Sequence, residues 1–101
     1  MNMENAALGF AAVGSTPRLK VLMALVRAGD HGLSVGAIQK RLLIPASTLA
    51  HHLKMLNDAG LITQVKKGRA IINQADYGRL QELGSFLLRE CCHDDLEKIT
   101  G

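Results

Sequence analysis

A segment near the middle of the chain carries side chains that suit contact with DNA bases. Leu49, Leu53 and Leu56 recur at helical spacing, so one face of a helix over about residues 45–59 turns toward a core. The other face and its flanks carry short hydroxyls, imidazoles and one ammonium: Ser47, Thr48, His51, His52 and Lys54. Such groups hydrogen-bond to base edges when a helix enters the major groove, and free amides at the helix start face phosphates.

Each of these residues also has an ordinary structural explanation. Ser47 and Thr48 can act only as capping groups in the first turn, and His51 and His52 can be surface histidines. A metal site at the two histidines is disfavoured, because adjacent positions on a helix point about 100° apart. The case for DNA contact therefore depends on the residues around this segment.

A basic hairpin comes next. Residues 61–67 and 70–74 are short extended runs, and Gly68 between them can supply the positive φ of a hairpin turn. Lys66, Lys67 and Arg69 are then at the tip, where cations suit phosphates or the minor groove. A solvated turn would explain these cations taken alone. Their order after a polar helix favours a DNA-binding wing.

Charge is concentrated in the same part of the chain. The net charge is +3, but residues 39–69 carry six cations and one anion, which leaves −2 for the remainder. The six cations are Lys40, Arg41, Lys54, Lys66, Lys67 and Arg69, and the anion is Asp58. A basic middle with a neutral-to-acidic remainder is typical of a face that binds a polyanion.

The two cysteines, Cys91 and Cys92, are adjacent and lie near the end of the chain. Two neighbouring thiols can bind a soft ion, form a vicinal or intersubunit disulfide on oxidation, or simply finish a helix. They are not the disulfide framework of a secreted domain, and the start of the chain lacks a basic signal-peptide region. No apolar run reaches the length of a membrane span, so we expect a cytoplasmic protein with no membrane partner.

The elements that must position these groups can be placed from periodicity and capping signals. A length of 101 residues fits one domain, 1–101, and the low aromatic content disfavours a β-sandwich. Helices are expected over residues 1–14, from Thr16 to about residue 28, after Ser34, over 45–59 and over 77–92. We therefore predict a mainly α winged helix-turn-helix of about five helices plus a two-stranded β-hairpin wing, with a flexible tail over 93–101.

Four segments resemble the ArsR/SmtB repressors, and the resemblance runs from about residue 6 to residue 92. They are Thr16-Pro17-Arg18-Leu19, Ser47-Thr48-Leu49-Ala50-His51-His52-Leu53-Lys54, Ala59-Gly60-Leu61-Ile62 and Lys67-Gly68-Arg69. The resemblance implies a homodimer built from residues 1–14 and 77–92, a palindromic double-stranded operator, and release of DNA when an inducer binds. It also implies that the recognition-helix role falls on Ser47, Thr48, His51, His52 and Lys54.

The same resemblance indicates which inducer-binding sites of the family this chain has. Ser34 and Gly36 stand where arsenic and lead sensors of the family carry two thiols, and residues 76–93 do not reproduce the zinc-type pattern. Cys91 and Cys92 resemble the CysCys ending of one arsenic-responsive branch, which implies trivalent arsenic, organic or inorganic, or antimony as ligand. Because arsenite prefers three thiolates, the pair favours methylarsenite, although the partner subunit, water or His93 could complete a site for arsenite.

Other functions remain open to different degrees. A redox-sensing or persulfide-sensing repressor of the same fold is the alternative use of the two thiols. An enzyme is not expected, because the chain has no glycine-rich phosphate loop, zinc protease motif, catalytic triad context or CxxC pair. No permanent cofactor is expected. A protein-interaction module on the same scaffold is the remaining alternative, since fold does not fix function.

Overall fold

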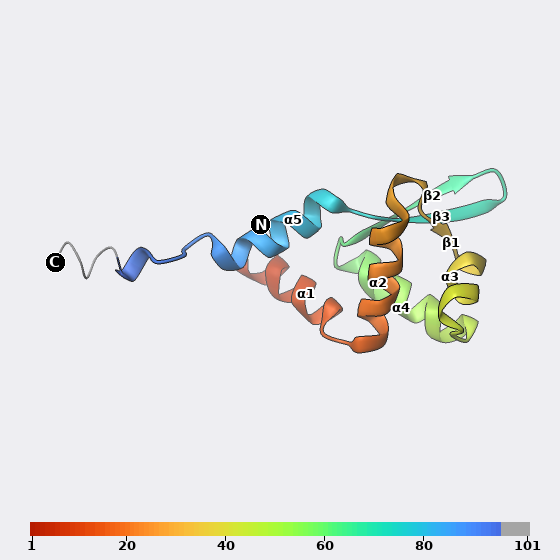
Figure 1. Ribbon diagram of the computed structural model, residues 1–101, viewed down its shortest axis with the longest axis horizontal. Helices are drawn as coiled ribbons and strands as arrows, with labels where there is room; N and C mark the ends of the chain where they lie inside the picture. Colours follow the sequence, from red (N-terminus) through yellow and green to blue (C-terminus); the bar gives the residue numbers. More distant parts are fainter. Residues whose placement is uncertain (96–101) are drawn as a thin grey trace.

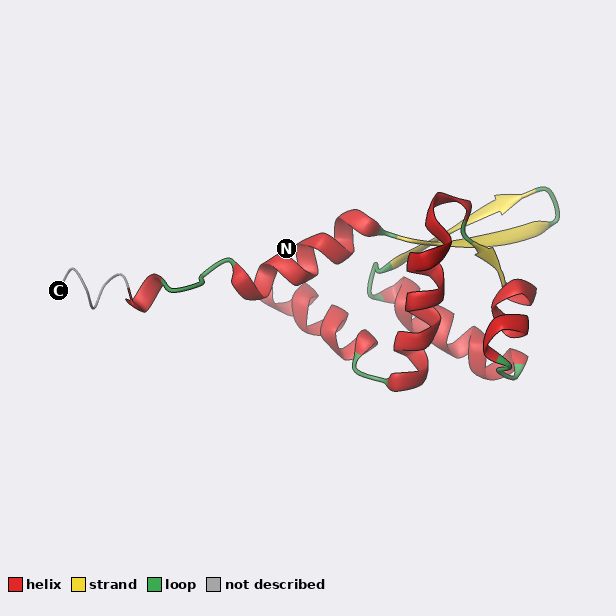
Figure 2. Ribbon diagram, in the orientation of Figure 1, coloured by secondary structure: helices red, strands yellow, loops and turns green. Residues whose placement is uncertain are grey.

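The computed structural model describes residues 1–95. The chain forms, in order, α1 (Met3–Val13), α2 (Thr16–Ala28), a 3-10 turn (Gly29–His31), β1 (Leu33–Ser34), α3 (Val35–Leu42), α4 (Ala46–Asp58), β2 (Ile62–Lys67), β3 (Ala70–Ala75) and α5 (Tyr77–Leu88). Figure 1 shows α1 and α5 together at one end, and the β2–β3 hairpin and α3 at the other. The predicted winged helix-turn-helix with five helices is confirmed, and Figure 2 shows how little of it is strand.

The sheet has three strands rather than the two predicted. Its order is β1-β3-β2, with both pairs antiparallel. The added strand is only two residues long, and Leu33 lies opposite Asn73, forty positions further along the chain. Asn73 is fully buried, and its Nδ2 atom donates a hydrogen bond to the Leu33 carbonyl at 3.2 Å. So short a strand has no periodicity of its own and exists only through this distant partner.

Serine and aspartate side chains begin three of the helices. The Ser15 hydroxyl accepts from the Arg18 amide, the Ser34 hydroxyl from the Ala37 amide, and the Asp76 carboxylate from the Arg79 amide. The cap at Ser34 agrees with the helix predicted to begin after this residue, and Ser15 caps α2 at the predicted start of that helix. Thr16 and Pro17 form the first turn, where the missing N–H of proline costs nothing.

One apolar core lies under the helix-turn-helix. The side chains of Leu25, Ile38, Leu49, Leu56 and Leu61 are completely buried, and they come from α2, α3, α4 and the residue before β2. Full burial of a leucine or isoleucine contributes about 1.5–3 kcal/mol, so this layer fixes which face of α4 is left outside. The leucines predicted to point inward from α4 do so.

α1 and α5 pack against each other and add Ala6, Ala12 and Leu83 to the same core. Gly9 of α1 allows close packing, because a Cβ atom there would lie 2.9 Å from Leu83 Cδ1 of α5. The side chain of Arg18, which belongs to α2, caps the C-terminal end of α1. Its Nε donates to the Ala12 carbonyl at 2.6 Å and its Nη2 to the Ala11 carbonyl at 3.1 Å. A cation on the last carbonyls of a helix also interacts favourably with the helix dipole.

The last helix is shorter than predicted. α5 ends at Leu88 instead of continuing to residue 92, so both cysteines lie beyond it. Leu87 and Leu88 are 67% and 69% exposed. Helix extension depends on burying an apolar face, and the protomer offers no surface against which to bury this one. Of the predicted flexible tail, residues 93–95 form part of a further helical turn and residues 96–101 lie outside the described part.

A helix that crosses a bilayer needs about 20 mostly apolar residues, and the helices of residues 1–95 are shorter. No single helix there is long and apolar enough to cross a bilayer, and the one pair that passes by length and composition, Met3–Val13 with Thr16–His31, is bent by 98°.

Three glycine substitutions separate backbone strain from steric contact. Gly29 and Gly32 both have positive φ (68° and 62°), but only at Gly32 would a Cβ atom strike neighbours, namely the Asn73 carbonyl and the Ile72 and Gln74 side chains. We expect Gly32→Ala to lower the free energy of unfolding by about 3 kcal/mol or more and Gly29→Ala by about 1–2 kcal/mol. Urea denaturation checks both values.

Gly36→Ala is the matched control. Gly36 lies in α3 with an open position for a Cβ atom, so alanine there should stabilise the protein by about 0.5 kcal/mol. Equal losses for Gly29→Ala and Gly32→Ala would show that the approach of β3 to Gly32 has no energetic importance.

Candidate nucleic-acid interface

The outer face of α4 is polar and free of contacts with the rest of the protomer. Ser47, Thr48, His51 and Lys54 are exposed, while Leu49, Leu53 and Leu56 are buried on the opposite side. No side chain caps the start of the helix at Pro45. Its first amides are therefore open to an anion, and the helix dipole favours negative charge at this end.

His52 differs from the sequence-based expectation. Its side chain is buried, with 8% of its surface exposed, so it does not share the outward face with the other four residues. Within residues 1–95, its Nδ1 atom has no hydrogen-bond partner. Burial lowers the pKa of His52, and the nearby charge of Arg18 and the neighbouring His51 lower it further. The imidazole is therefore held in its neutral form as part of the inner face of α4.

Periodicity alone could not place His52. Position 52 lies one residue before Leu53 and three after Leu49, at the border between the two faces of the helix. Polar character favoured the outer face, whereas the contacts of α4 with α1 and α2 cover this border. The sequence signal that could have indicated this packing is that the buried residues of α1 are all small, since α1 contacts α4.

Lys54 is paired in the free protein. Its Nζ atom lies 2.8 Å from Asp58 Oδ2, one helical turn away, and both side chains are more than half exposed. The hydrogen bond to Asp58 raises the pKa of Lys54. An exposed pair of this kind contributes little to stability, so a phosphate group can displace Asp58 at little cost.

The hairpin carries its cations at the predicted place. Lys67 lies opposite Ala70, which leaves Gly68 and Arg69 as the connecting residues, and Gly68 has a φ of 61°. Lys66, Lys67 and Arg69 are all exposed. Figure 1 shows this hairpin extending away from the body of the protein, at the end opposite to α1 and α5.

Two residues, Leu43 and Gln39, hold the turn between α3 and α4. Leu43 ends α3 with a left-handed backbone (φ 55°, ψ 42°), and its amide donates to the Gln39 carbonyl at 2.8 Å. The Gln39 side-chain amide donates to the Ile44 carbonyl at 3.4 Å. Leu43 is also 87% exposed. A leucine in this conformation is strained by about 1–2 kcal/mol, and a glycine there would have been a recognisable signal.

The cysteine pair forms a second possible site, after the end of α5. The two sulfur atoms are 3.2 Å apart, and either can donate the hydrogen bond between them. This contact is possible because the backbone leaves the helix: Cys92 has a φ of 64°. Both residues are exposed, and the hydrogen bond to Cys92 raises the pKa of the Cys91 thiol. In the described part of the chain, no group of three or more His, Cys, Asp or Glu residues is placed to hold a metal ion.

Comparison with known proteins agrees with this geometry. Residues 18–65, which run from α2 into β2, match the family described as a helix-turn-helix domain. An ArsR-like transcriptional regulator from Rhodococcus sp. RHA1 has 28% sequence identity and a TM-score of 0.83, covering 96% of this chain and 89% of that one. The chain is a winged helix-turn-helix transcriptional regulator that resembles the ArsR-like regulators. Comparison with curated proteins gave no match.

Two further solved structures resemble this regulator. Reduced HlyU from Vibrio cholerae N16961 has 27% identity and a TM-score of 0.66, covering 88% of this chain and 90% of that one. The homodimeric winged helix-turn-helix DNA-binding domain Mb0332 from Mycobacterium bovis has 22% identity and a TM-score of 0.68, covering 88% and 82%. At that identity, the second likeness is one of fold.

The buried imidazole predicts a specific loss of stability in mild acid. Because its pKa is lower in the folded state, the unfolded chain takes up a proton at His52 first as the pH falls through about 6.5. His52 therefore contributes stability above that pH, and the contribution declines down to the folded-state pKa. We expect His52→Leu to lose less unfolding free energy than the wild type between pH 8 and pH 5, measured by urea denaturation.

Thr48→Ala, which removes an exposed side chain from the same helix without changing a titratable group, is the control and should follow the wild-type pH dependence. Parallel curves for the wild type and His52→Leu would contradict the assignment of a neutral, buried His52.

Proposed function

We propose that this regulator is a repressor that binds a palindromic operator as a homodimer, through α4 in the major groove and the hairpin on the flanking phosphates. The observation that carries the proposal is the uncovered face of α4, where hydroxyl, imidazole and ammonium groups lie opposite a fully buried leucine layer. The bases would be read by Ser47, Thr48, His51 and Lys54. His52, whose side chain is buried, is better suited to fixing the orientation of the helix. Lys66, Lys67 and Arg69 would contact phosphates.

The proposed dimer uses α1 and α5. Large apolar side chains remain exposed on these two helices: Met3, Leu8, Leu87 and Leu88 are 59–71% exposed. A monomer rarely leaves such a set uncovered, and α1 and α5 lie at the end of the molecule away from the wing. The Mycobacterium bovis domain of the same fold is described as homodimeric. Two-fold symmetry would present two α4 helices to major grooves about 34 Å apart.

The wing cations should determine how steeply affinity depends on salt. Each phosphate contact that is lost should reduce the slope of log K against log salt concentration by about 0.9. We expect Lys67→Gln and Arg69→Gln each to produce that change and to weaken binding to all sequences about equally, measured by fluorescence anisotropy on an operator and on an unrelated duplex.

Lys20→Gln, on the exposed side of α2, is the matched control and should leave the slope unchanged. Unaltered slopes in the wing variants would remove the hairpin from the interface. A wild-type affinity independent of salt would remove DNA binding itself and favour a protein-interaction module.

We also propose that a trivalent arsenical bound by Cys91 and Cys92 is the inducer. The sulfur–sulfur distance of 3.2 Å supports binding of both thiols to one soft atom. The reaction would be a condensation: each As–OH group and each S–H give one As–S bond and one water. Because the thiol protons leave in the water formed, the raised pKa of Cys91 does not oppose the overall reaction.

Two thiols favour methylarsenite over arsenite. Methylarsenite has two hydroxyl groups and a methyl group that stays on arsenic, so two condensations saturate it. Arsenite and trivalent antimony would keep a third position, and no third ligand joins the two cysteines within residues 1–95. For arsenite, that ligand would come from water or from the partner subunit. His93, the next residue, would complete the site only in a conformation other than the one described.

Release of DNA would follow from linkage. The cysteines lie three and four residues beyond Leu88, the last residue of α5, and the Cys91 amide donates to the Leu88 carbonyl at 2.9 Å. Because α5 belongs to the proposed dimer seam, a ligand that binds both sulfurs alters the end of this seam. The inducer lowers DNA affinity to the extent that it binds the DNA-free arrangement of the dimer more tightly. A small change in the angle between protomers would shift the two α4 helices away from successive major grooves.

The test is operator release followed by fluorescence anisotropy with reduced protein. Methylarsenite should release the operator from the wild type and from the control Ser85→Ala on α5, but not from Cys91→Ser or Cys92→Ser. Arsenite should act only at higher concentration. No release by either compound would contradict the arsenical proposal and leave the DNA-binding proposal intact.

Redox or persulfide sensing is the second candidate for the same pair. Moving the sulfurs from 3.2 Å to the bonding distance of about 2.05 Å would form a vicinal disulfide, with two protons and two electrons passing to a peroxide or polysulfide. The raised pKa of Cys91 disfavours the thiolate that starts this reaction. Release by a peroxide or polysulfide, reversed by dithiothreitol and absent with methylarsenite, would favour this candidate.

A further inference from the structure

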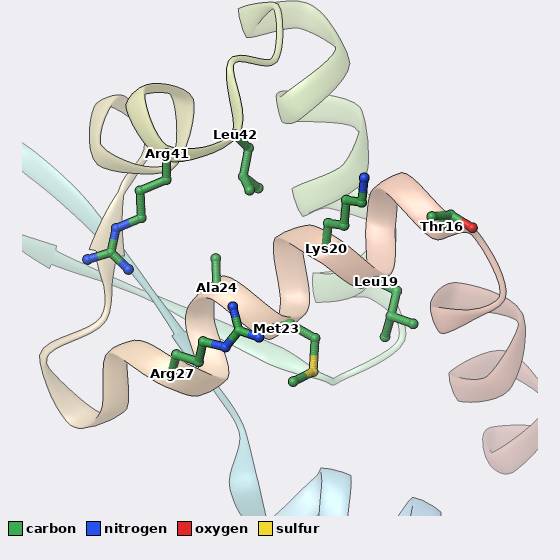
Figure 3. Close-up of a pocket in the computed structure, with 8 residues that line it drawn as sticks. All are labelled: Thr16, Leu19, Lys20, Met23, Ala24, Arg27, Arg41 and Leu42. Atoms are coloured by element: carbon green, nitrogen blue, oxygen red, sulfur yellow. The ribbon is translucent and has the colours of Figure 1, made fainter.

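A groove separates α2 from the end of α3, on a part of the protein that neither proposed site uses. Its volume is about 500 Å³, and it is lined by Thr16, Leu19, Lys20, Met23, Ala24, Arg27, Arg41 and Leu42. Figure 3 shows Leu42 and Arg41 reaching from α3, while the other six residues come from α2. Ligand pockets in proteins have volumes of about 300–1,000 Å³, so the space is large enough for a small organic molecule.

The lining combines an apolar floor with unpaired positive charge. Leu19 and Met23, one helical turn apart on α2, are 41% and 39% exposed and form an apolar part of the lining. Three cations, Lys20, Arg27 and Arg41, also line the groove, and none of the lining residues is acidic. None of these three cations is paired with an acidic side chain within residues 1–95.

The charges are arranged along the groove and not around it. In Figure 3, Arg27 and Arg41 lie toward the same end, whereas Leu19 and Thr16 lie toward the other. Residues 16–27 of α2 cover about 16 Å along the helix axis. An elongated ligand could therefore place an acidic group near the two arginines and its apolar body over Met23 and Leu19.

We propose that this groove binds a small amphipathic organic anion, such as a medium-chain carboxylate, as a second effector separate from the thiol ligand. The carboxylate pairs with Arg41 and Arg27, because guanidinium groups match carboxylates in geometry and charge. The alkyl chain covers Met23, Leu19 and Leu42. Neither the outer face of α4 nor the cysteine pair contributes to this lining.

The position of the groove gives the ligand a route to the DNA-binding surface. Arg41 and Leu42 are the last residues of α3 and directly precede the strained Leu43 turn into α4. A ligand between α2 and α3 therefore acts on the helix that sets the position of α4. This consequence rests on the proposed DNA-binding function, whereas binding in the groove does not.

The test compares three ten-carbon probes by isothermal titration calorimetry on the reduced, full-length protein. Decanoate should bind saturably with one site per protomer. Decanol and decyltrimethylammonium, which lack the negative charge, should bind at least about fivefold more weakly, as expected from the loss of one exposed ion pair.

Variants then locate the site. Arg41→Gln should weaken decanoate binding about fivefold, and Met23→Gln should weaken it through loss of apolar contact. Lys40→Gln removes an equal charge from the adjacent position of α3 outside the groove and should leave the affinity within about twofold. Circular dichroism of each variant confirms that it is folded.

Three results would overturn the proposal: equal affinities for decanoate and decanol, unchanged binding in Arg41→Gln, or equal weakening in Lys40→Gln. Decanoate binding that changes operator affinity in Cys91→Ser as in the wild type would establish a second effector site. Decanoate binding without any effect on DNA would keep the site and remove its coupling to α4.

Discussion

The approach of β3 to the start of the helix-turn-helix is the constraint on which the rest of the structure depends. Asn73, in the central strand, is completely buried, and its side chain bonds to the Leu33 carbonyl on one side and to the Gln64 amide on the other. A buried amide left without partners would cost about 1–3 kcal/mol, so these two bonds hold all three strands in one register. Gly32 permits the contact, because any side chain there would meet the Asn73 carbonyl. The wing is thereby fixed relative to α3 and α4.

A second polar connection links the proposed dimer helices to α4. Arg18 donates two hydrogen bonds to the end of α1, and its charge contributes to the lowered pKa of His52 in α4. The same residue therefore touches the end of one dimer helix and influences the inner face of the helix proposed to read DNA. A change in the position of α1 would alter both the packing against α4 and the charge near His52. This arrangement supports communication between the two ends of the molecule without requiring any long-range charge effect.

Much of the fold could be predicted from the sequence because its signals are local. The Ser34 cap, the leucines of α4 and the positive φ of Gly68 each depend on residues within one element. The predictions that were wrong depend instead on contacts between residues far apart in the sequence. β1 exists only through Asn73, the burial of His52 depends on how closely α4 packs, and α5 ends where the protomer no longer offers a surface to cover Leu87 and Leu88. None of these three outcomes can be read from periodicity, because each is decided by a neighbour distant in the sequence.

The position of the ion pair between Lys54 and Asp58 makes the two ends of α4 electrostatically different. The beginning of this helix combines open amides, hydroxyl groups and the positive end of the helix dipole, whereas its last turn ends in a carboxylate. A polyanion is attracted to the first end and, once Lys54 leaves Asp58, repelled by the second. On a DNA duplex, α4 would thus enter the groove obliquely, with its first two turns deep and its last turn lifted toward solvent. Docking in the reverse sense would place Asp58 among the phosphates, so a single acidic residue discriminates between the two orientations.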